Sequence, residues 1–242
     1  MLKVCVNGAR LPTEHPRLTA DPTAIAEEAR ASITAGAAAV HVHPKSPTGH
    51  DSLIGADVDR FVTAIRAACP RVPIGVTSGA WATSSPADRL EAIRTWTVIP
   101  DFVSVNWHEE GADEVAELLI GMGVGVEAGL WHLEGLSRWR NSPSRSRCLR
   151  VLIELPDLAG VDEITTMATE LVESVRAAEP ELPILLHGEE RSTWPALDLA
   201  VRWGFDTRIG LEDTLILPDG RRARDNVELV ATAFERIRSS GL

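Results

Sequence analysis

Short apolar runs alternate along the chain with longer segments whose apolar residues recur every three or four positions. The short runs are typical of strands, and the longer segments are typical of helices that bury one face. We predict strands at 2–6, 38–43, 73–78, 101–106, 124–130, 149–155, 183–186 and 207–211. We predict helices at 23–35, 57–68, 86–96, 112–122, 161–178, 192–203 and 225–238, with a less regular segment at 132–145.

The predicted strands are apolar throughout, which indicates burial on both faces of a parallel sheet. Eight strands, each followed by a helical segment, favour an α/β fold of the TIM (β/α)8 barrel type over a doubly wound sheet. No linker or low-complexity tract interrupts the alternation. We therefore expect a single barrel domain that spans residues 1–242, with its active site at the C-terminal ends of the strands.

The composition is that of a globular protein, with 44% hydrophobic and 24% charged residues. No apolar run is long enough to predict a membrane span, and the first residues lack the pattern of a signal peptide. The cysteines Cys5, Cys69 and Cys148 are few and far apart, which argues against a disulfide framework and favours a cytoplasmic location. The net charge of −11 disfavours nucleic acid and anionic membranes as general partners, although a local arginine cluster could still bind a small anion.

Two histidines stand out at the end of the second predicted strand. His41 and His43 point to the same side, because successive strand residues alternate faces, and Pro44 ends the strand. Two imidazoles one pleat apart can both reach a single divalent metal. The alternative is a pair of ordinary strand histidines, and this short motif alone does not separate the two.

Other polar residues also gather at the predicted strand ends. They are Asn7, Arg10, Thr77, Ser78, Ser104, Asn106, His108, Glu127, Glu154, His187, Glu189, Glu190, Arg208, Glu212 and Asp213. Glu212 could supply an oxygen ligand beside the two histidines, and two histidines with one carboxylate form a catalytic site whose usual occupant is zinc. Trp81, Trp107 and Trp131 each follow a strand, where an indole either lines a pocket or packs beneath a loop.

The last predicted strand carries a second charged pair. By the two-residue period, Arg208, Gly210 and Glu212 share one face, and Gly210 would leave space above the metal. Asp213 would point elsewhere on a regular strand, but near the strand end it could turn back to Arg208. The alternative is that Arg208 and Asp213 form a purely structural ion pair at the barrel rim.

Several segments resemble the β-keto acid cleavage enzymes, whose prototype is the 3-keto-5-aminohexanoate cleavage enzyme of lysine fermentation. The principal matches are the HxH segment at 36–43, Thr-Ser-Gly at 77–79 and the RxGxED segment at 208–215, with further matches at 25–29, 126–127 and 226–230. The resemblance runs nearly end to end, and its two-part signature is specific because both parts fall at the expected strands.

The resemblance implies a zinc-dependent TIM barrel, usually a homotetramer, that converts a β-keto acid and acetyl-CoA to acetoacetate and a new acyl-CoA. It implies one Zn²⁺ per chain, held by His41, His43 and Glu212, that polarises the keto group of the substrate. A small-molecule β-keto acid and acetyl-CoA, rather than nucleic acid or membrane, would be the partners.

The resemblance also implies roles for other side chains. The pair Arg208 and Asp213 matches the groups that activate the substrate, and we expect Asp213 to accept the proton because an arginine stays protonated. Thr77 or Ser78 matches a hydroxyl that hydrogen-bonds the reacting oxygens. Glu127 matches a further active-site carboxylate. We place Asn7, Arg10, Asn106 and His108 among the substrate-binding residues.

The chain departs from the family pattern at three places. Arg10 stands where members often carry a glutamate that faces the amino group of the prototype's substrate, so we expect neutral or anionic β-keto acids to be preferred over amines. Alternatively, Arg10 faces solvent or meets the phosphates of CoA. Pro44, Lys45 and Ser46 replace the usual residues after HxH. The chain is also shorter than typical members, with the loss expected in the CoA-binding loops around strands five and six.

Two other functions remain open from the sequence. The same site could serve a metal-dependent aldolase or a retro-Claisen hydrolase that uses no CoA. The chain could also be a barrel that binds a metal or ligand without turnover, although the intact Arg208, Glu212 and Asp213 argue against this.

Overall fold

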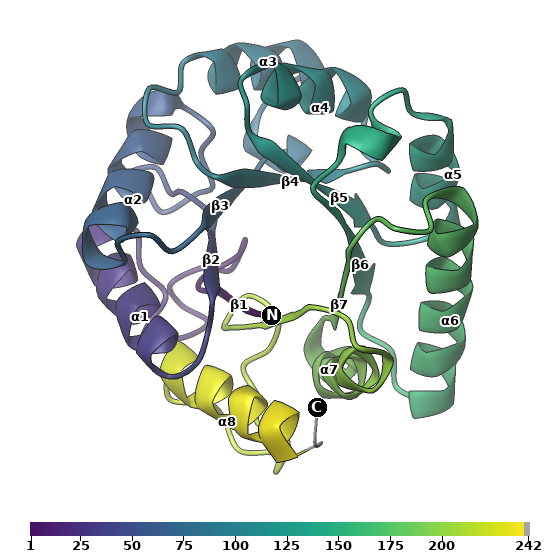
Figure 1. The fold of residues 1–242 in the computed structure, drawn as a ribbon. Helices are drawn as coiled ribbons and strands as arrows, with labels where there is room; N and C mark the ends of the chain where they lie inside the picture. The colour runs from purple at the N-terminus through teal and green to yellow at the C-terminus, as the bar shows by residue number, and fades with distance from the viewer. Residues whose placement is uncertain (240–242) are drawn as a thin grey trace.

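The barrel is built from one parallel sheet. The computed structural model describes residues 1–239. In that part of the chain, eight strands pair in the order β7-β6-β5-β4-β3-β2-β1-β8. Their bounds are β1 (Leu2–Cys5), β2 (Ala39–Val42), β3 (Ile74–Thr77), β4 (Phe102–Asn106), β5 (Gly125–Leu130), β6 (Arg150–Leu155), β7 (Ile184–Gly188) and β8 (Thr207–Ile209). Figure 1 shows the strands as an inner ring, which confirms the predicted TIM barrel.

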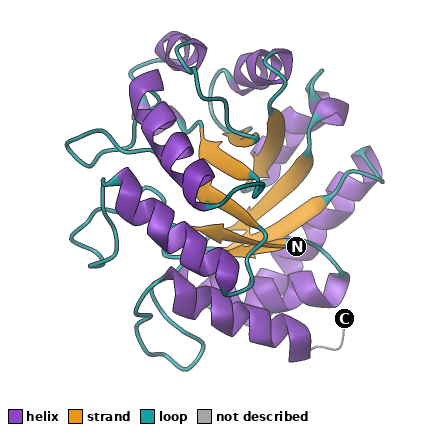
Figure 2. Cartoon of the chain, turned by 60° about the vertical axis from the view of Figure 1, so that its left-hand side comes forward, coloured by secondary structure: helices purple, strands orange, loops and turns teal. Residues whose placement is uncertain are grey.

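The helices surround this ring, as both views of the ribbon show (Figures 1 and 2). Their bounds are α1 (Pro22–Thr34), α2 (Gly55–Ala68), α3 (Pro86–Arg94), α4 (Ala112–Gly121), α5 (Leu133–Asn141), α6 (Val161–Ala178), α7 (Thr193–Trp203) and α8 (Asn226–Ser239). Three short 3-10 turns are η1 (Ala80–Ala82), η2 (Arg145–Arg147) and η3 (Glu190–Ser192). Strand side chains pack outward against the helices, so the main apolar core lies between the two rings.

The barrel closes at a short seam between β7 and β8. The seam holds one parallel bridge, between Leu185 and Asp206, and the Leu186 N–H donates to the carbonyl of Asp206 at 2.9 Å. Asp206 also accepts from the N-terminal ammonium group of Met1 at 2.6 Å. The first and last strands are thereby held together beneath the site.

Two segments differ from the sequence prediction. The segment at 132–145 contains a regular helix, α5, whose first turn is capped where the Gly135 N–H donates to His132 Nδ1. Its apolar stripe is only Leu136 and Trp139, both buried, which is too short to give a clear period. Strand β8 ends at Ile209 rather than at residue 211, because the N–H groups of Asp213 and Thr214 turn back to the Gly210 carbonyl.

No helix among the described residues combines the length and the apolar character that crossing a bilayer requires.

Candidate metal centre and active site

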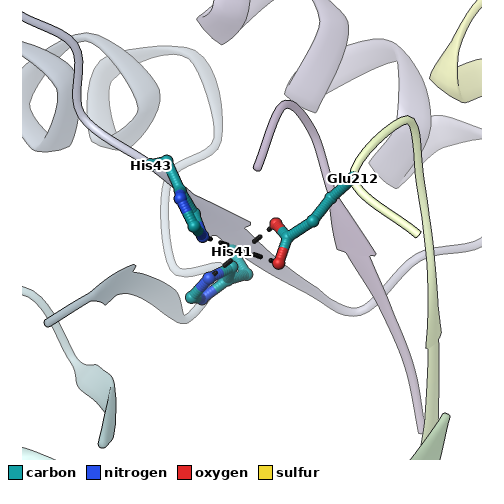
Figure 3. Close-up of side chains that lie close together, drawn as sticks. All are labelled: His41, His43 and Glu212. Atoms are coloured by element: carbon teal, nitrogen blue, oxygen red, sulfur yellow. Dashed lines mark ion pairs between the residues drawn. The ribbon is translucent and has the colours of Figure 1, made fainter. Parts of the chain in front are cut away.

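His41, His43 and Glu212 converge at the C-terminal end of the barrel. The histidines come from β2 and the residue after it, and Glu212 comes from the turn after β8 (Figure 3). His43 Nε2 lies 3.5 Å from Glu212 Oε1, and His41 Nε2 lies 3.9 Å from Glu212 Oε2. One ligand atom from each residue lies within 4.8 Å of the others. The structure thus brings together the three side chains that the sequence predicted as metal ligands.

The surroundings of these side chains fit a bound divalent cation. His43 Nδ1 lies 2.9 Å from Asp51 Oδ2, which turns Nε2 toward Glu212, as carboxylates beside metal-binding histidines usually do. Asp51 is itself held by Lys45 Nζ at 2.5 Å and by the indole N–H of Trp81 at 2.7 Å. Glu212 Oε2 is buried without a hydrogen-bond partner, which a metal ion would supply.

Two of the three groups, His41 and Glu212, have the charge state that a metal ligand needs. Burial lowers the pKa of His41 well below its usual value, so its ring is neutral, as a metal ligand must be. Burial opposes ionisation of Glu212, but Arg208 and the two histidines outweigh it and hold the pKa of Glu212 well below its usual value. Burial also disfavours charge on His43, yet Glu212 and Asp51 raise the pKa of His43 to about 9.

Arg208 lies at the centre of a second cluster beside the metal ligands. Its Nε donates to Asp213 Oδ1 at 2.9 Å and to His187 Nδ1 at 3.1 Å, and its Nη2 donates to Glu212 Oε1 at 2.9 Å. Asp213 therefore turns back to Arg208, as the sequence suggested, because the chain leaves β8 in a turn. Asp213 is fully buried and is not part of the cavity lining, and its Oδ2 has no hydrogen-bond partner.

Gly210 has a different role from the predicted one. A Cβ at this position would lie 1.9 Å from the carbonyl oxygen of Cys5, so glycine permits β1 and the chain after β8 to approach closely. The residue does not serve to open space above the metal. Glu212 reaches the site through the turn that follows, and not through the two-residue period of a strand.

A cavity of about 340 Å³ opens next to these residues. Its lining comes from the loops and strand ends of the whole barrel mouth: Ala9, Arg10, Glu14, His41, His43, Thr77, Trp81, Ser104, Asn106, Trp131, Leu152, Glu154, Glu189, Glu190, Arg208 and Glu212. Trp81 and Trp131 thus line the pocket, whereas Trp107 is buried in the apolar core. A cavity of this size, in which many polar groups converge beside the indoles of Trp81 and Trp131, is suited to a small polar substrate.

The hydroxyl and amide residues divide into two groups. Thr77 and Asn106 are on the cavity wall. Ser78 is buried outside the lining, and its hydroxyl donates to the carbonyl of Ser104 at 2.8 Å. Asn7 is also outside the lining, where its amide forms hydrogen bonds of 2.8 and 2.9 Å with the backbone of His43. Asn7 therefore positions a metal ligand.

His108 also lies outside the cavity lining. The centroid of its ring lies 4.9 Å from that of Trp131 and 5.3 Å from that of His132. Burial lowers the pKa of His108 below its usual value. The structure therefore places His108 behind Trp131, where it supports the cavity wall.

Arg10 lies on the cavity wall, but its charge is already balanced. Its guanidinium forms a short contact with Glu190 and lies 3.2 Å from Glu14 Oε2. These two carboxylates leave no net positive charge for a substrate. The charge argument against an amine substrate is therefore weaker than the sequence indicated.

Glu127 is the predicted catalytic residue that the structure moves away from the site. It is fully buried inside the barrel, outside the cavity lining, 2.6 Å from Lys3 Nζ and 3.3 Å from Arg150 Nε. Glu127 stands at the start of β5, so its side chain lies in the lower layer of the barrel. The sequence pattern placed it on the right strand but did not fix its depth.

Sequence reasoning assigned no role to Asp51, Glu154, Glu189 or His187. The last three were visible as polar residues at predicted strand ends. Asp51 falls in a predicted turn, where the sequence pattern indicates no role. In the structure, an antiparallel bridge between Lys45 and Asp51 places Asp51 beside His43.

The chain is similar to proteins of one known family. The profile of the beta-keto acid cleavage enzyme family matches residues 1–129 and 157–242. Two curated proteins named 3-keto-5-aminohexanoate cleavage enzyme are similar to the chain. The one from Fusobacterium nucleatum is 24% identical and the one from Acetoanaerobium sticklandii is 22% identical, each over 95% of this chain and 88% of the relative.

The fold is also similar to that of ObcA in its apo structure, with a TM-score of 0.72 at 20% identity. That match covers 93% of this chain and 63% of ObcA, so the chain spans under two thirds of the length of that protein. The profile match covers most of the chain and confirms the resemblance seen in the sequence: the chain belongs to the beta-keto acid cleavage enzyme family.

Proposed function

We propose that the chain is a zinc-dependent acyltransferase that converts a β-keto acid and acetyl-CoA to acetoacetate and a new acyl-CoA. The observation that carries this proposal is the cluster of His41, His43 and Glu212 on the wall of a polar cavity, with Asp51 orienting His43. When bound there, Zn²⁺ supplies Lewis-acid polarisation of the keto group.

The residues around the cluster have complementary roles in this proposal. Arg208 faces the cavity and can hold the substrate carboxylate or an enolate oxygen with its fork of N–H groups. Asp213 neutralises Arg208 and, with one oxygen free of hydrogen bonds, is the proposed acceptor of the C2 proton. Thr77 and Asn106 offer hydrogen bonds to oxygens of the bound substrate.

The similar proteins support this choice of chemistry. The curated relatives are named as enzymes that cleave a β-keto acid. ObcA has been solved with oxaloacetate, and with a C4-CoA adduct and oxalate. A protein of similar fold thus binds both a keto acid and a CoA adduct.

One observation favours a second candidate, a metal-dependent aldolase or retro-Claisen hydrolase that uses no CoA. The family profile leaves residues 130–156 unmatched. This segment holds α5, η2 and all of β6, the region where the sequence predicted lost CoA-binding loops. The metal cluster and Arg208 lie outside the unmatched segment, so C–C bond cleavage could continue without CoA.

Measured acetoacetate decides between the two candidates. We expect protein purified without added metal to contain Zn²⁺ by elemental analysis, and to form acetoacetate from acetyl-CoA and at least one acid in a β-keto acid panel. The double variant His41→Ala, His43→Ala should lose both the metal and the product. Cleavage of a β-keto acid that is unchanged by omitting acetyl-CoA would support the second candidate, and equal metal content in the double variant would contradict the assigned site.

A homotetrameric assembly and a cytoplasmic location remain proposals based on the family resemblance and on the cysteine pattern. Light scattering coupled to size exclusion would test the assembly directly.

A further inference from the structure

Two carboxyl groups on the cavity wall have no part in the function proposed above. Glu154 lies near the end of β6, and Glu189 directly follows β7. The Glu189 N–H donates to the carbonyl of Leu155 at 2.9 Å, which holds the two residues side by side. Their carboxyl groups lie within hydrogen-bonding reach of each other. Both line the same cavity as His41, His43 and Glu212.

A hydrogen bond between two carboxyl groups requires a proton, because two carboxylates offer only acceptors. Glu189 is the member that keeps it, since burial and the charge of Glu154 raise the pKa of Glu189 to about 8. Burial also disfavours ionisation of Glu154, but His187 and Arg208 outweigh burial and lower the pKa of Glu154. The pair thus holds one proton at neutral pH.

His187 lies beside the ionised member. Arg208 Nε lies 3.1 Å from His187 Nδ1, and His187 Nε2 lies 3.2 Å from Glu154 Oε2. His187 Nδ1 also lies 3.4 Å from Asp213 Oδ1. The charged or titratable groups that surround the pair are His187 on β7, Arg208 on β8, Asp213 after β8, and the ion-paired Arg10 and Glu190 on the cavity wall.

We propose that the Glu154–Glu189 pair is the proton donor in C–C bond cleavage, with Glu189 as the donating residue and His187 as a positioning residue. This inference rests on the proposed function, in either its CoA-dependent or its CoA-free form. When the bond between C2 and the keto carbon breaks, its electron pair stays on C2. The Glu189 O–H bond then breaks, a C2–H bond forms, and the pair is left without a proton. Solvent then restores that proton. In the CoA-dependent form it is balanced by the proton taken earlier from C2, which goes to solvent, and in the CoA-free form by the proton released when water adds to the keto carbon.

The test follows exchange of the C2 protons of acetoacetate in deuterium oxide by NMR, with the Zn²⁺-supplemented protein and without acetyl-CoA. Exchange needs a base and a donor but no acyl transfer. We expect Glu189→Gln to slow exchange by about 10²- to 10⁴-fold, the usual contribution of general acid–base catalysis. The matched control is Asp157→Asn, an exposed acid on the loop after β6 that pairs with Arg191, and it should exchange at the wild-type rate.

The pH profile of exchange distinguishes a donor from a structural residue. The wild-type rate should fall as pH rises through about 8, because Glu189 loses its proton there. Glu154→Gln removes the neighbouring charge that raises this pKa, so the fall should move to lower pH. Three results would each overturn the assignment of Glu189 as the proton donor. They are wild-type exchange no faster than exchange in buffer, exchange in Glu189→Gln equal to that of wild type, and a pH profile that does not move in Glu154→Gln. Acyl transfer from acetyl-CoA is measured in parallel, and exchange without it would support the donor while contradicting the acyltransferase.

Discussion

At the scale of single residues, the two histidines of one motif are held in different ways. His43 is fixed by Asp51 through its side chain and by Asn7 through its backbone, whereas the Nδ1 of His41 is buried without a hydrogen bond. A metal held here would therefore bind one pre-oriented imidazole and one that its buried position alone restrains. Asp51 and Asn7 therefore fix the orientation of only one of the two imidazoles.

Asp213 carries the prediction that belongs to this scale. We expect Asp213→Asn to keep the fold and the zinc. Asparagine is close to aspartate in size, and Glu212 still pairs with Arg208 in the variant. The variant should lose turnover by about 10²- to 10⁴-fold, because an amide cannot accept the C2 proton. Circular dichroism, elemental analysis and acetoacetate formation are the measurements. A near-normal rate would show that Arg208 and Asp213 form a structural pair.

At the scale of elements, the turn after β8 brings most of the chemistry together. The strand stops at Ile209, and the turn that begins at Gly210 directs Glu212 to the metal ligands and Asp213 back to Arg208. A longer strand would have sent these two carboxylates to opposite faces. The close approach of β1 is what allows this turn to form at the barrel mouth.

Gly210→Ala tests this dependence. The added methyl group meets the Cys5 carbonyl, so we expect a loss of about 1–3 kcal/mol in the free energy of unfolding, the usual cost of overpacking. Zinc affinity should fall as well, since the turn carries Glu212. Thermal unfolding and metal titration measure the two effects. The control Gly121→Ala has open space around its Cβ in α4 and should be neutral or slightly stabilising. Equal melting temperatures for Gly210→Ala and wild type would refute the argument.

At the scale of the whole molecule, the barrel separates its charges into two layers. Above lie the metal ligands, Arg208 and the carboxyl pair. Below lies a buried network in which Glu127 joins Lys3 to Arg150, and Arg150 continues to Asp206 at 2.7 Å. This lower network links β1, β5 and β6 across the barrel, which favours a structural role for Glu127.

Glu127→Gln separates stability from catalysis. Removing one partner of a buried ion pair leaves Lys3 uncompensated, and such losses cost about 3–5 kcal/mol. We expect the folded variant to keep its zinc and its turnover per molecule, with the loss confined to denaturant unfolding. The double variant Lys3→Met, Glu127→Leu should recover much of the stability, because Arg150 still pairs with Asp206. A stable Glu127→Gln protein without turnover would instead return Glu127 to the catalytic groups.

The sequence by itself determined the barrel, the His41, His43 and Glu212 cluster, and the family. These follow from local signals: apolar runs mark strands buried on both faces, and a parallel barrel brings all the strand ends to one mouth. Only the tertiary structure decided how deep and how well paired each polar residue lies. It placed Glu127 in the lower layer of the barrel and paired Arg10 with two glutamates. It also buried Ser78 outside the cavity lining and placed Asp51 within hydrogen-bond distance of His43. Depth and pairing depend on register and on contacts between residues far apart in the chain, which no local pattern records.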